Sequence, residues 1–236
     1  MKPAVLATAL FALALCLSGC IGAPVALTPL TEQRLQTQAP IRFLLTFDDG
    51  PSASGYANPS RSVIQDLADN PVQPGIKAIF FLQTDAWRAG GSPRGRKTMA
   101  REHAAGHILA FHTATRWHSN HRLLNDNDLE QTLRQGAASI ASITGAAPRL
   151  VRPPFWNYDR RTFAAYQRHG MHILLTDLSA NDGKIWGFNA SPQRRANLLR
   201  QLSLVRERIA LGQLPTVDGV IPVVVTFHDI NRYTAR

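Results

Sequence analysis

The chain has 236 residues, of which 44% are hydrophobic and 18% charged, and its formal net charge is +10. This length suits one well-cored domain, and the apolar content excludes an intrinsically disordered chain. The single long apolar run lies at the extreme N-terminus, so we expect the remaining residues to fold in water.

That N-terminal run has the pattern of a secretory signal. Lys2 precedes an almost wholly apolar stretch from Ala4 to Leu17, which is too short to span a bilayer comfortably. The four residues ending at Cys20, Leu-Ser-Gly-Cys, resemble the bacterial lipobox, whose cysteine becomes lipidated after cleavage immediately before it. We therefore predict a lipoprotein signal peptide over residues 1–19 and an exported protein anchored to a membrane through lipidated Cys20. An ordinary signal peptide cut near Ala23 is the alternative.

Cysteine usage constrains the mature domain, because Cys16 and Cys20 are the only cysteines in the chain. A domain without cysteines must hold any metal with histidines and carboxylates. Ile21 after Cys20, in place of aspartate, resembles the signal for sorting to the outer membrane, where the protein would face the periplasm. Residues 20–40, rich in Pro, Thr, Gln and Ala, are expected to form the lipidated cysteine and a linker to a domain spanning 41–236.

The charge stays strongly basic in the mature chain, since removal of Lys2 lowers it only from +10 to +9. A basic field can attract nucleic acid, but the arginines are scattered without the interleaved aromatic residues of a base-stacking platform. We therefore expect no nucleic-acid partner. An anionic cell wall or lipopolysaccharide surface is the favoured partner, and a merely solubilising surface is the alternative.

From Ile41 onward, apolar strand patterns alternate with helical patterns. The predicted strands are 41–46, 76–82, 107–111, 150–152, 173–176 and 221–227, and the predicted helices are 62–70, 96–105, 126–144, 159–169 and 192–211. This succession predicts an α/β fold with a parallel sheet, either open or closed into a barrel. The last helix has the clearest signals, with Ser191 as N-cap, Pro192 at its first position and Gly212 after its end.

Ionisable residues follow five of the predicted strands. The loops after the carboxyl ends of parallel strands meet on one face, where active sites are found. The residues placed there are Asp48 and Asp49, His112 and His118, Arg152, Asp177, and His228 with Asp229. We expect one of the two adjacent aspartates to bind a cation while the other removes a proton. A turn that merely caps the next helix is the alternative.

The segment Thr46-Phe47-Asp48-Asp49-Gly50-Pro51 matches the first motif of the NodB-homology polysaccharide deacetylases, carbohydrate esterase family four. Residues 106–113 and 152–155 resemble the second and third motifs, and Asp177 and His228 fall where the fourth and fifth motifs are expected. The resemblance covers nearly all of residues 41–229 and implies a distorted (β/α) barrel of the polysaccharide deacetylase type. Only seven residues follow Asp229, so we expect a barrel that is incompletely closed at the C-terminus.

The resemblance also implies roles for individual residues. It implies a divalent metal, commonly zinc with cobalt or another divalent ion as alternatives, held by Asp49 and two histidines of the second motif. Among the catalytic residues, Asp48 would be the general base, Arg152 would hold that base, His228 would be the general acid and Asp177 would tune it. The backbone N–H of Phe155 would help to polarise the acetyl carbonyl.

The second motif departs from the family pattern. Family members usually place the two histidine ligands four residues apart on one helical face, but the residue four after His112 is Arg116. Six residues turn a helix by about 600°, so His118 can share a metal with His112 only through an irregular loop or bulge. We predict His118 as the second histidine ligand, and His121 is the alternative.

Two further features have competing interpretations. His103 and His107 have the helical spacing of a metal pair, but Gly106 between them would end the helix, so this pair is disfavoured. Three tryptophans near the predicted site, Trp117, Trp156 and Trp186, could stack on sugar faces. Ordinary packing is the alternative for each tryptophan.

The predicted function is metal-dependent removal of acetyl groups from N-acetylglucosamine-type residues of a cell-wall or extracellular polysaccharide. Hydrolysis of O-acetyl esters is one alternative, since the same arrangement of water, metal and oxyanion serves both reactions. A lipid-anchored glycan-binding protein without turnover is another, because the histidine spacing is unusual. A mere binder would have little reason to retain Asp48.

Overall fold

The computed structural model describes residues 38–182, 194–231 and 234. The predicted signal peptide, Cys20, Ile21, Trp186 and the Ser191-Pro192 start of the long helix lie outside these described residues. No helix within the described ranges is both long and apolar enough to cross a membrane.

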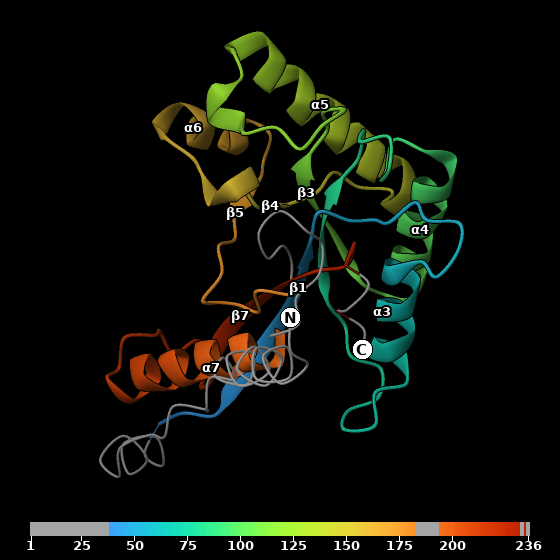
Figure 1. The fold of residues 1–236 in the computed structure, drawn as a ribbon. Coiled ribbons are helices and arrows are strands. Elements are labelled where there is room, and N and C mark those ends of the chain that lie inside the picture. The colour runs from blue at the N-terminus through green and yellow to red at the C-terminus, as the bar shows by residue number, and fades with distance from the viewer. Residues whose placement is uncertain (1–37, 183–193, 232–233, 235–236) are drawn as a thin grey trace, which may run out of the picture.

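Seven strands form one curled parallel sheet with helices around it (Figure 1). The strands are β1 (Ile41–Asp48), β2 (Ile79–Gln83), β3 (Ile108–Thr113), β4 (Leu150–Val151), β5 (His172–Ile173), β6 (Leu178–Ser179) and β7 (Ile221–His228). Their order is β5-β4-β3-β2-β1-β7-β6, and the outer strands β5 and β6 do not pair with each other in the described part of the chain. The predicted distorted and incompletely closed (β/α) barrel is therefore confirmed.

The helices pack on the outside of this sheet. They are α3 (Pro59–Ala68), α4 (Pro93–Ala104), α5 (Asp126–Thr144), α6 (Arg160–Arg168) and α7 (Arg194–Ala210), with short 3₁₀ turns η1 (His121–Leu123) and η2 (Pro154–Trp156). Helix α5 packs against β3, α6 against β5 and α7 against β6. In Figure 1, α3 and α4 lie on one flank of the sheet and α7 lies on the other. The predicted site residues lie at the ends of the strands and in the loops that follow them.

Polar side chains determine where four of the helices begin. The capping residues are Asn58 for α3, Ser92 for α4, Asn125 for α5 and Asp159 for α6, and each side chain accepts a hydrogen bond from a backbone N–H in the first turn. Helices α3 and α4 begin three residues earlier than the predicted 62–70 and 96–105, because proline follows each cap and suits the first helical position. The predicted bounds of α5 are confirmed.

The centre of the sheet aligns two of the predicted site residues. Strand β1 pairs with β7 over eight residues, and the last pair of this ladder is Asp48 with His228. The ring of Phe47 stacks on Phe80 and Phe227 at centroid distances of 5.0 and 5.6 Å, so the strands are packed on an apolar core just before the site. Central parallel strands covered on both faces need such continuous apolar sequence. The core therefore holds the ends of β1 and β7 in a defined register.

The predicted strand 173–176 does not exist as one strand. The chain forms β5 at one edge of the sheet, and residues 174–177 then cross to β6 at the opposite edge. The side chain of Arg152 donates hydrogen bonds to the carbonyls of Leu174 and Leu175 at 3.0 and 3.4 Å. These carbonyls would face a neighbouring strand in a continuous ladder. The buried arginine thus stabilises the crossing across the open side of the barrel.

Candidate active site

Asp49, His112 and His118 bring three donor atoms together at the carboxyl end of the sheet. The Nε2 atoms of His112 and His118 lie 3.3 and 3.5 Å from Asp49 Oδ1 and 3.0 Å from each other. His112 lies within β3, and His118 lies in the irregular loop that follows. The two histidines therefore do not lie on one face of a helix. Because one is at a strand end and the other in a loop, their rings meet despite the spacing of six residues. The structure thus brings the three predicted ligands together.

The chemistry of this cluster suits a divalent cation. His112 Nδ1 lies 2.7 Å from the carbonyl oxygen of Arg152, which can only accept, so a neutral His112 ring presents its Nε2 lone pair to the cluster. Burial alone would raise the pKa of Asp49, but the hydrogen bond from His112 and the nearby histidine charges lower it overall. One carboxylate and two imidazoles converge within 4.8 Å, as in catalytic zinc sites with three protein ligands and open positions. The residues present therefore fit a metal.

The alternative histidines are excluded by their contacts. His121 is fully buried, its Nδ1 lies 2.9 Å from the Tyr166 hydroxyl, and its ring stacks on Phe111. Burial lowers the pKa of His121 to about 3, as expected for a neutral ring in the core. His107 Nδ1 accepts a hydrogen bond from Ala78 N–H, and His103 is exposed on α4. Neither His121 nor the pair of His103 and His107 forms a metal site.

Arg152 holds Asp48 in a buried position next to the cluster. Arg152 Nη1 donates to Asp48 Oδ1 at 2.7 Å, and both residues are almost completely inaccessible to solvent. The same nitrogen donates to the hydroxyls of Thr46 and Thr226 at 2.7 and 2.9 Å. Burial raises the pKa of Asp48, and the positive charge of Arg152 counteracts part of that rise. The predicted contact between Arg152 and Asp48 is present.

His228 contacts a different aspartate from the predicted one. Its Nδ1 lies 2.8 Å from Asp182 Oδ1, and its backbone N–H donates to Asp182 Oδ2 at 2.8 Å. Asp177 instead accepts from the N–H of Val224 at 2.9 Å and lies 3.7 Å from a nitrogen of Arg208. The prediction that Asp177 tunes His228 is wrong in its geometry, because Asp177 lies level with Val224, four residues before the end of β7.

Asp182 was missed because the sequence does not show the register between β6 and β7. Leu178 and Ser179 pair with Val225 and Thr226, so the residues after Ser179 reach the same edge of the sheet as His228. A strand placed at 178–179 rather than 173–176 would have identified Asp182 by the strand-end rule. Burial alone would lower the pKa of His228, but the hydrogen bond and charge of Asp182 raise it to about 9.

Asp229, predicted to lie on the same rim, is buried beneath the turn that carries Asp49. Its carboxylate accepts a hydrogen bond from the Ser60 hydroxyl, and burial raises the pKa of Asp229 to about 7. A β-carbon on Gly50 would lie 2.2 Å from Asp229 Oδ1, so only glycine allows the turn to pass so close. Asp49 has a φ of 69°, which turns the chain sharply after β1. Asp229 therefore supports this turn from below.

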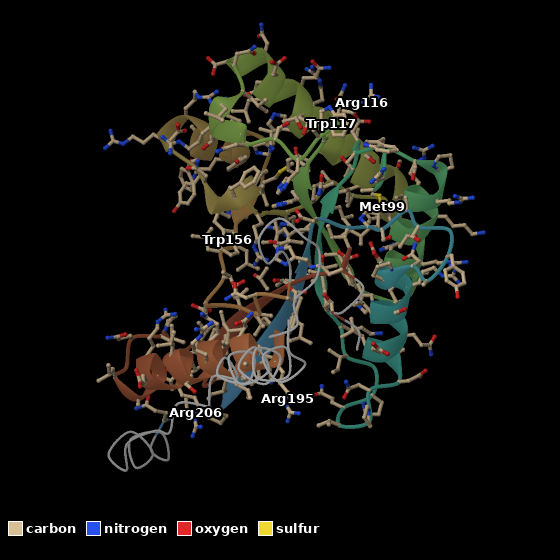
Figure 2. All side chains as sticks on the ribbon, viewed as in Figure 1. Met99, Arg116, Trp117, Trp156, Arg195 and Arg206 are labelled. Atoms are coloured by element: carbon tan, nitrogen blue, oxygen red, sulfur yellow. The ribbon has the colours of Figure 1, made fainter. Side chains whose placement is uncertain are left out.

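Aromatic residues border the cluster on two sides. The ring of Phe155 stacks on His118 at a centroid distance of 4.5 Å, which places this residue next to the cluster. Trp156 is half-exposed, and Figure 2 shows it well apart from Trp117. Trp117 lines a groove next to His118 together with Trp87, a residue that the sequence interpretation did not single out. Trp87 lies in the loop after β2, where the strand-end rule could have found it.

We predict that His118→Ala and Asp49→Ala each weaken zinc binding by at least about 100-fold, because each removes a direct ligand, whereas even outer-sphere partners contribute about 10- to 100-fold. Competition with a chromophoric chelator measures the affinity. His121→Gln is the control and should bind zinc like the unmodified protein. Equal zinc affinity in all three variants would show that the cation is held elsewhere.

We predict that Asp182→Asn lowers the pKa of His228 by at least about one pH unit, because the amide keeps the shape but removes the negative charge that favours the imidazolium. Since this pKa is raised to about 9 in the unmodified protein, His228 is protonated below that pH and loses its proton above it. The variant should therefore lose the His228 proton at lower pH, as measured by titration of the ring resonances by NMR. Asp177→Asn is the matched control, and an equal effect of both variants would contradict the assigned pairing.

Comparison with known proteins places this geometry in a family. The family model described as polysaccharide deacetylase matches residues 36–174. A chitin deacetylase of Pestalotiopsis sp is 28% identical over 143 residues, which cover 61% of this chain and 44% of that protein. A peptidoglycan-N-acetylglucosamine deacetylase of Bacillus cereus is 30% identical over 112 residues, which cover 47% of this chain and 35% of that protein. The chain thus spans less than half the length of these two relatives.

A solved structure shares the fold. The chitin deacetylase of Colletotrichum lindemuthianum superposes with a TM-score of 0.60 and 24% sequence identity, covering 84% of this chain and 77% of that one. The family model covers more than half of this chain, including the turn with Asp48 and Asp49, the histidines of the cluster and Arg152. The chain belongs to the polysaccharide deacetylase family.

Proposed function

We propose that the chain is a metal-dependent hydrolase that removes acetyl groups from N-acetylated sugars of a cell-wall or extracellular polysaccharide. The observation that carries this proposal is the separation of two adjacent carboxylates. Asp48 is engaged by buried Arg152, whereas Asp49 faces His112 and His118. Family membership and the deacetylase names of the relatives support the same reaction class.

The cation would be held by Asp49, His112 and His118. A divalent ion such as zinc or cobalt lowers the pKa of a water molecule and acts as a Lewis acid toward a carbonyl oxygen. The ring of Phe155 covers one side of His118, which limits the orientations of that ligand. In this proposal the backbone N–H of Phe155 donates to the acetyl oxygen as negative charge develops there.

Asp48 acts as the general base in this proposal. Burial raises its pKa, so its carboxylate accepts a proton more readily than an ordinary aspartate does. The carboxylate takes one proton from the attacking water while the water oxygen forms a bond to the acetyl carbon. Arg152 fixes its position through the 2.7 Å hydrogen bond and stays protonated within the buried pair.

His228 acts as the general acid in this proposal. Strand pairing sets Asp48 and His228 side by side at the ends of β1 and β7. With its pKa raised to about 9, His228 is protonated at neutral pH and can give a proton to the sugar nitrogen as the C–N bond breaks. The products are acetate and a free sugar amine, which carries the proton from His228.

The protonated His228 favours an amide substrate over an O-acetyl ester. An amine is expelled only when its nitrogen receives a proton, whereas a sugar alkoxide needs less assistance. A glycan-binding protein without turnover is less favoured, because binding a sugar does not need a second carboxylate, Asp48, beside the cluster of Asp49, His112 and His118. N-deacetylation therefore remains the preferred reaction.

We predict that Asp48→Asn lowers the rate of acetate release at least about 100-fold, because an amide cannot accept the proton. Its zinc content should stay close to that of the unmodified protein, since Asp48 is not among the ligands. The assay follows acetate release from matched N-acetylated and O-acetylated glycans with zinc or cobalt, and circular dichroism confirms folding. Release from O-acetylated glycans alone would favour the esterase, and no release with any metal would favour the binding protein.

We also propose that the mature protein is a lipoprotein anchored through Cys20, facing the periplasm from the outer membrane. The support is the lipobox-like sequence ending at Cys20 and the Ile21 that follows it. Two acyl chains or more give stable membrane attachment, so no spanning helix would be needed.

We predict that Cys20→Ala abolishes incorporation of labelled palmitate when the full chain is expressed in bacteria, because the thiol that would carry the lipid is lost. The membrane fractions should then contain no lipidated protein. Cys16→Ala is the matched control and should keep the label. Labelled protein in the Cys20 variant would disprove the anchor.

A further inference from the structure

A groove of about 940 Å³ opens directly beside the metal cluster, with Asp49 and His118 in its wall. Most of its remaining lining comes from the loops after β1, β2 and β3, and the start of α4 and Ile230 after β7 complete it. Ligand sites typically have volumes of about 300 to 1,000 Å³, so this groove has the size of a binding site. A polymer that presents an acetyl group to the cluster can therefore reach this groove with its neighbouring sugars.

Two tryptophans expose their rings in the groove. Trp87 and Trp117 come from different loops, are 49% and 62% exposed, and meet edge to face at a centroid distance of 6.3 Å. Adjacent exposed apolar side chains form the kind of patch that marks a ligand-binding groove. Aromatic rings of this kind offer flat apolar faces to the C–H faces of sugars.

Three arginines line the same groove. The guanidinium of Arg88 lies 4.2 Å from the centre of the Trp87 ring, and that of Arg116 lies 5.7 Å from the centre of the Trp117 ring. Arg94 packs over the backbone of Gly55, since a β-carbon built there would lie 3.3 Å from its guanidinium. Figure 2 shows Arg116 beside Trp117. Stacking of this type holds a guanidinium in place while its N–H groups remain free to bind an anion.

Within residues 38–182, 194–231 and 234, no ion pair neutralises the arginines of the groove. Five other arginines form ion pairs with carboxylates, but within the described part of the chain Arg88, Arg94 and Arg116 form none. Among the described residues that line the groove, Asp49 is the only one with a carboxylate, and that carboxylate faces His112 and His118. An anionic ligand would relieve the repulsion among three cations in one groove, which solvent and salt screen only in part.

We propose that this groove binds an acidic sugar adjoining the N-acetylated sugar, so that the substrate class is an anionic N-acetylated glycan. Trp87 and Trp117 contact the sugar ring, while Arg88, Arg94 and Arg116 bind its anionic group. Carboxylate and sulfate oxygens both match the forked N–H donors of arginine. The identity of the substrate rests on the proposed deacetylase function, but binding of the acidic glycan does not.

Binding is tested first, with the full-length Asp48→Asn protein, in which turnover is blocked. The probes are a hyaluronan tetrasaccharide, which alternates N-acetylglucosamine with a uronic acid, and the same tetrasaccharide after reduction of its carboxylates to alcohols. Calorimetry should give at least about 10-fold tighter binding of the carboxylated form, and added salt should weaken this preference. Equal affinity for the two forms would overturn the proposal.

A second binding comparison, with a sulfated sugar, identifies which anionic group the groove prefers. Chitotetraose and its 6-O-sulfated form have the same length and N-acetyl groups but differ in charge. Preference for the sulfated form as well as for the carboxylated one indicates a general anion site. Preference for the carboxylated form without preference for the sulfated one assigns a carboxylate as the anion.

Substitutions of the arginines test whether the preference for the carboxylated tetrasaccharide arises in the groove. Arg88→Gln, Arg94→Gln and Arg116→Gln should each reduce the preference for the carboxylated tetrasaccharide by about 5- to 10-fold, because each removes one charged donor. Arg134→Gln, on the exposed face of α5, removes the same charge away from the groove and is the matched control. Equal loss of affinity for both tetrasaccharides in the groove variants would indicate a merely structural role and overturn the proposal.

Measuring acetate release by the unmodified protein distinguishes failure of the acidic groove from failure of the proposed deacetylase function. Tight binding of the acidic glycan without release of acetate under any metal would disprove the deacetylase and leave the acidic groove in place. Release of acetate from both tetrasaccharides with the same kcat/KM, unchanged by the groove substitutions, would disprove the acidic groove and leave the deacetylase. A kcat/KM at least about 10-fold higher for the carboxylated tetrasaccharide would support both.

Discussion

The buried ion pair between Arg152 and Asp48 is the interaction on which the rest of the structure depends. One guanidinium reaches β1 through Asp48 and Thr46, β7 through Thr226, and the crossing between β5 and β6 through two backbone carbonyls. Removing one member of a buried pair leaves an uncompensated charge, which costs about 3–5 kcal/mol in comparable proteins. A barrel whose edge strands do not pair needs such an internal connection. The residue that orients the candidate base therefore also connects the two sides of the open sheet.

This pair also explains how two neighbouring aspartates can serve different purposes. The carboxylate of Asp48 accepts a hydrogen bond from Arg152. The positive φ of Asp49 turns the backbone, and its side chain lies next to the histidines of β3 and the following loop. The turn can form only because Gly50 allows close contact with the buried carboxylate of Asp229. Two groups of the same chemical type are thus given different environments, which is how proteins separate acid, base and ligand roles.

Histidines show the same dependence on surroundings. His112, His118, His121 and His228 carry the same ring, but His121 is neutral in the core, His228 is held protonated by Asp182, and the other two face Asp49. The unusual spacing of His112 and His118 is accommodated because neither lies on a helix. The groove beside them brings exposed tryptophans and arginines together from the loop after β2, the loop that carries His118 and the start of α4. The candidate ligands and the groove therefore lie together at the carboxyl ends of the strands.

The sequence by itself was sufficient to determine the alternation of strands and helices, the first motif with Asp48 and Asp49, and the candidate histidines. These features depend on local patterns of apolar, charged and turn-forming residues, and a strand-end rule then predicts which side chains share a rim. Only the tertiary structure decided that Asp182 rather than Asp177 contacts His228, that His121 lies in the core, and that Asp229 lies beneath Gly50. These outcomes depend on the register between β6 and β7 and on packing between segments far apart in the chain, which local sequence patterns do not encode.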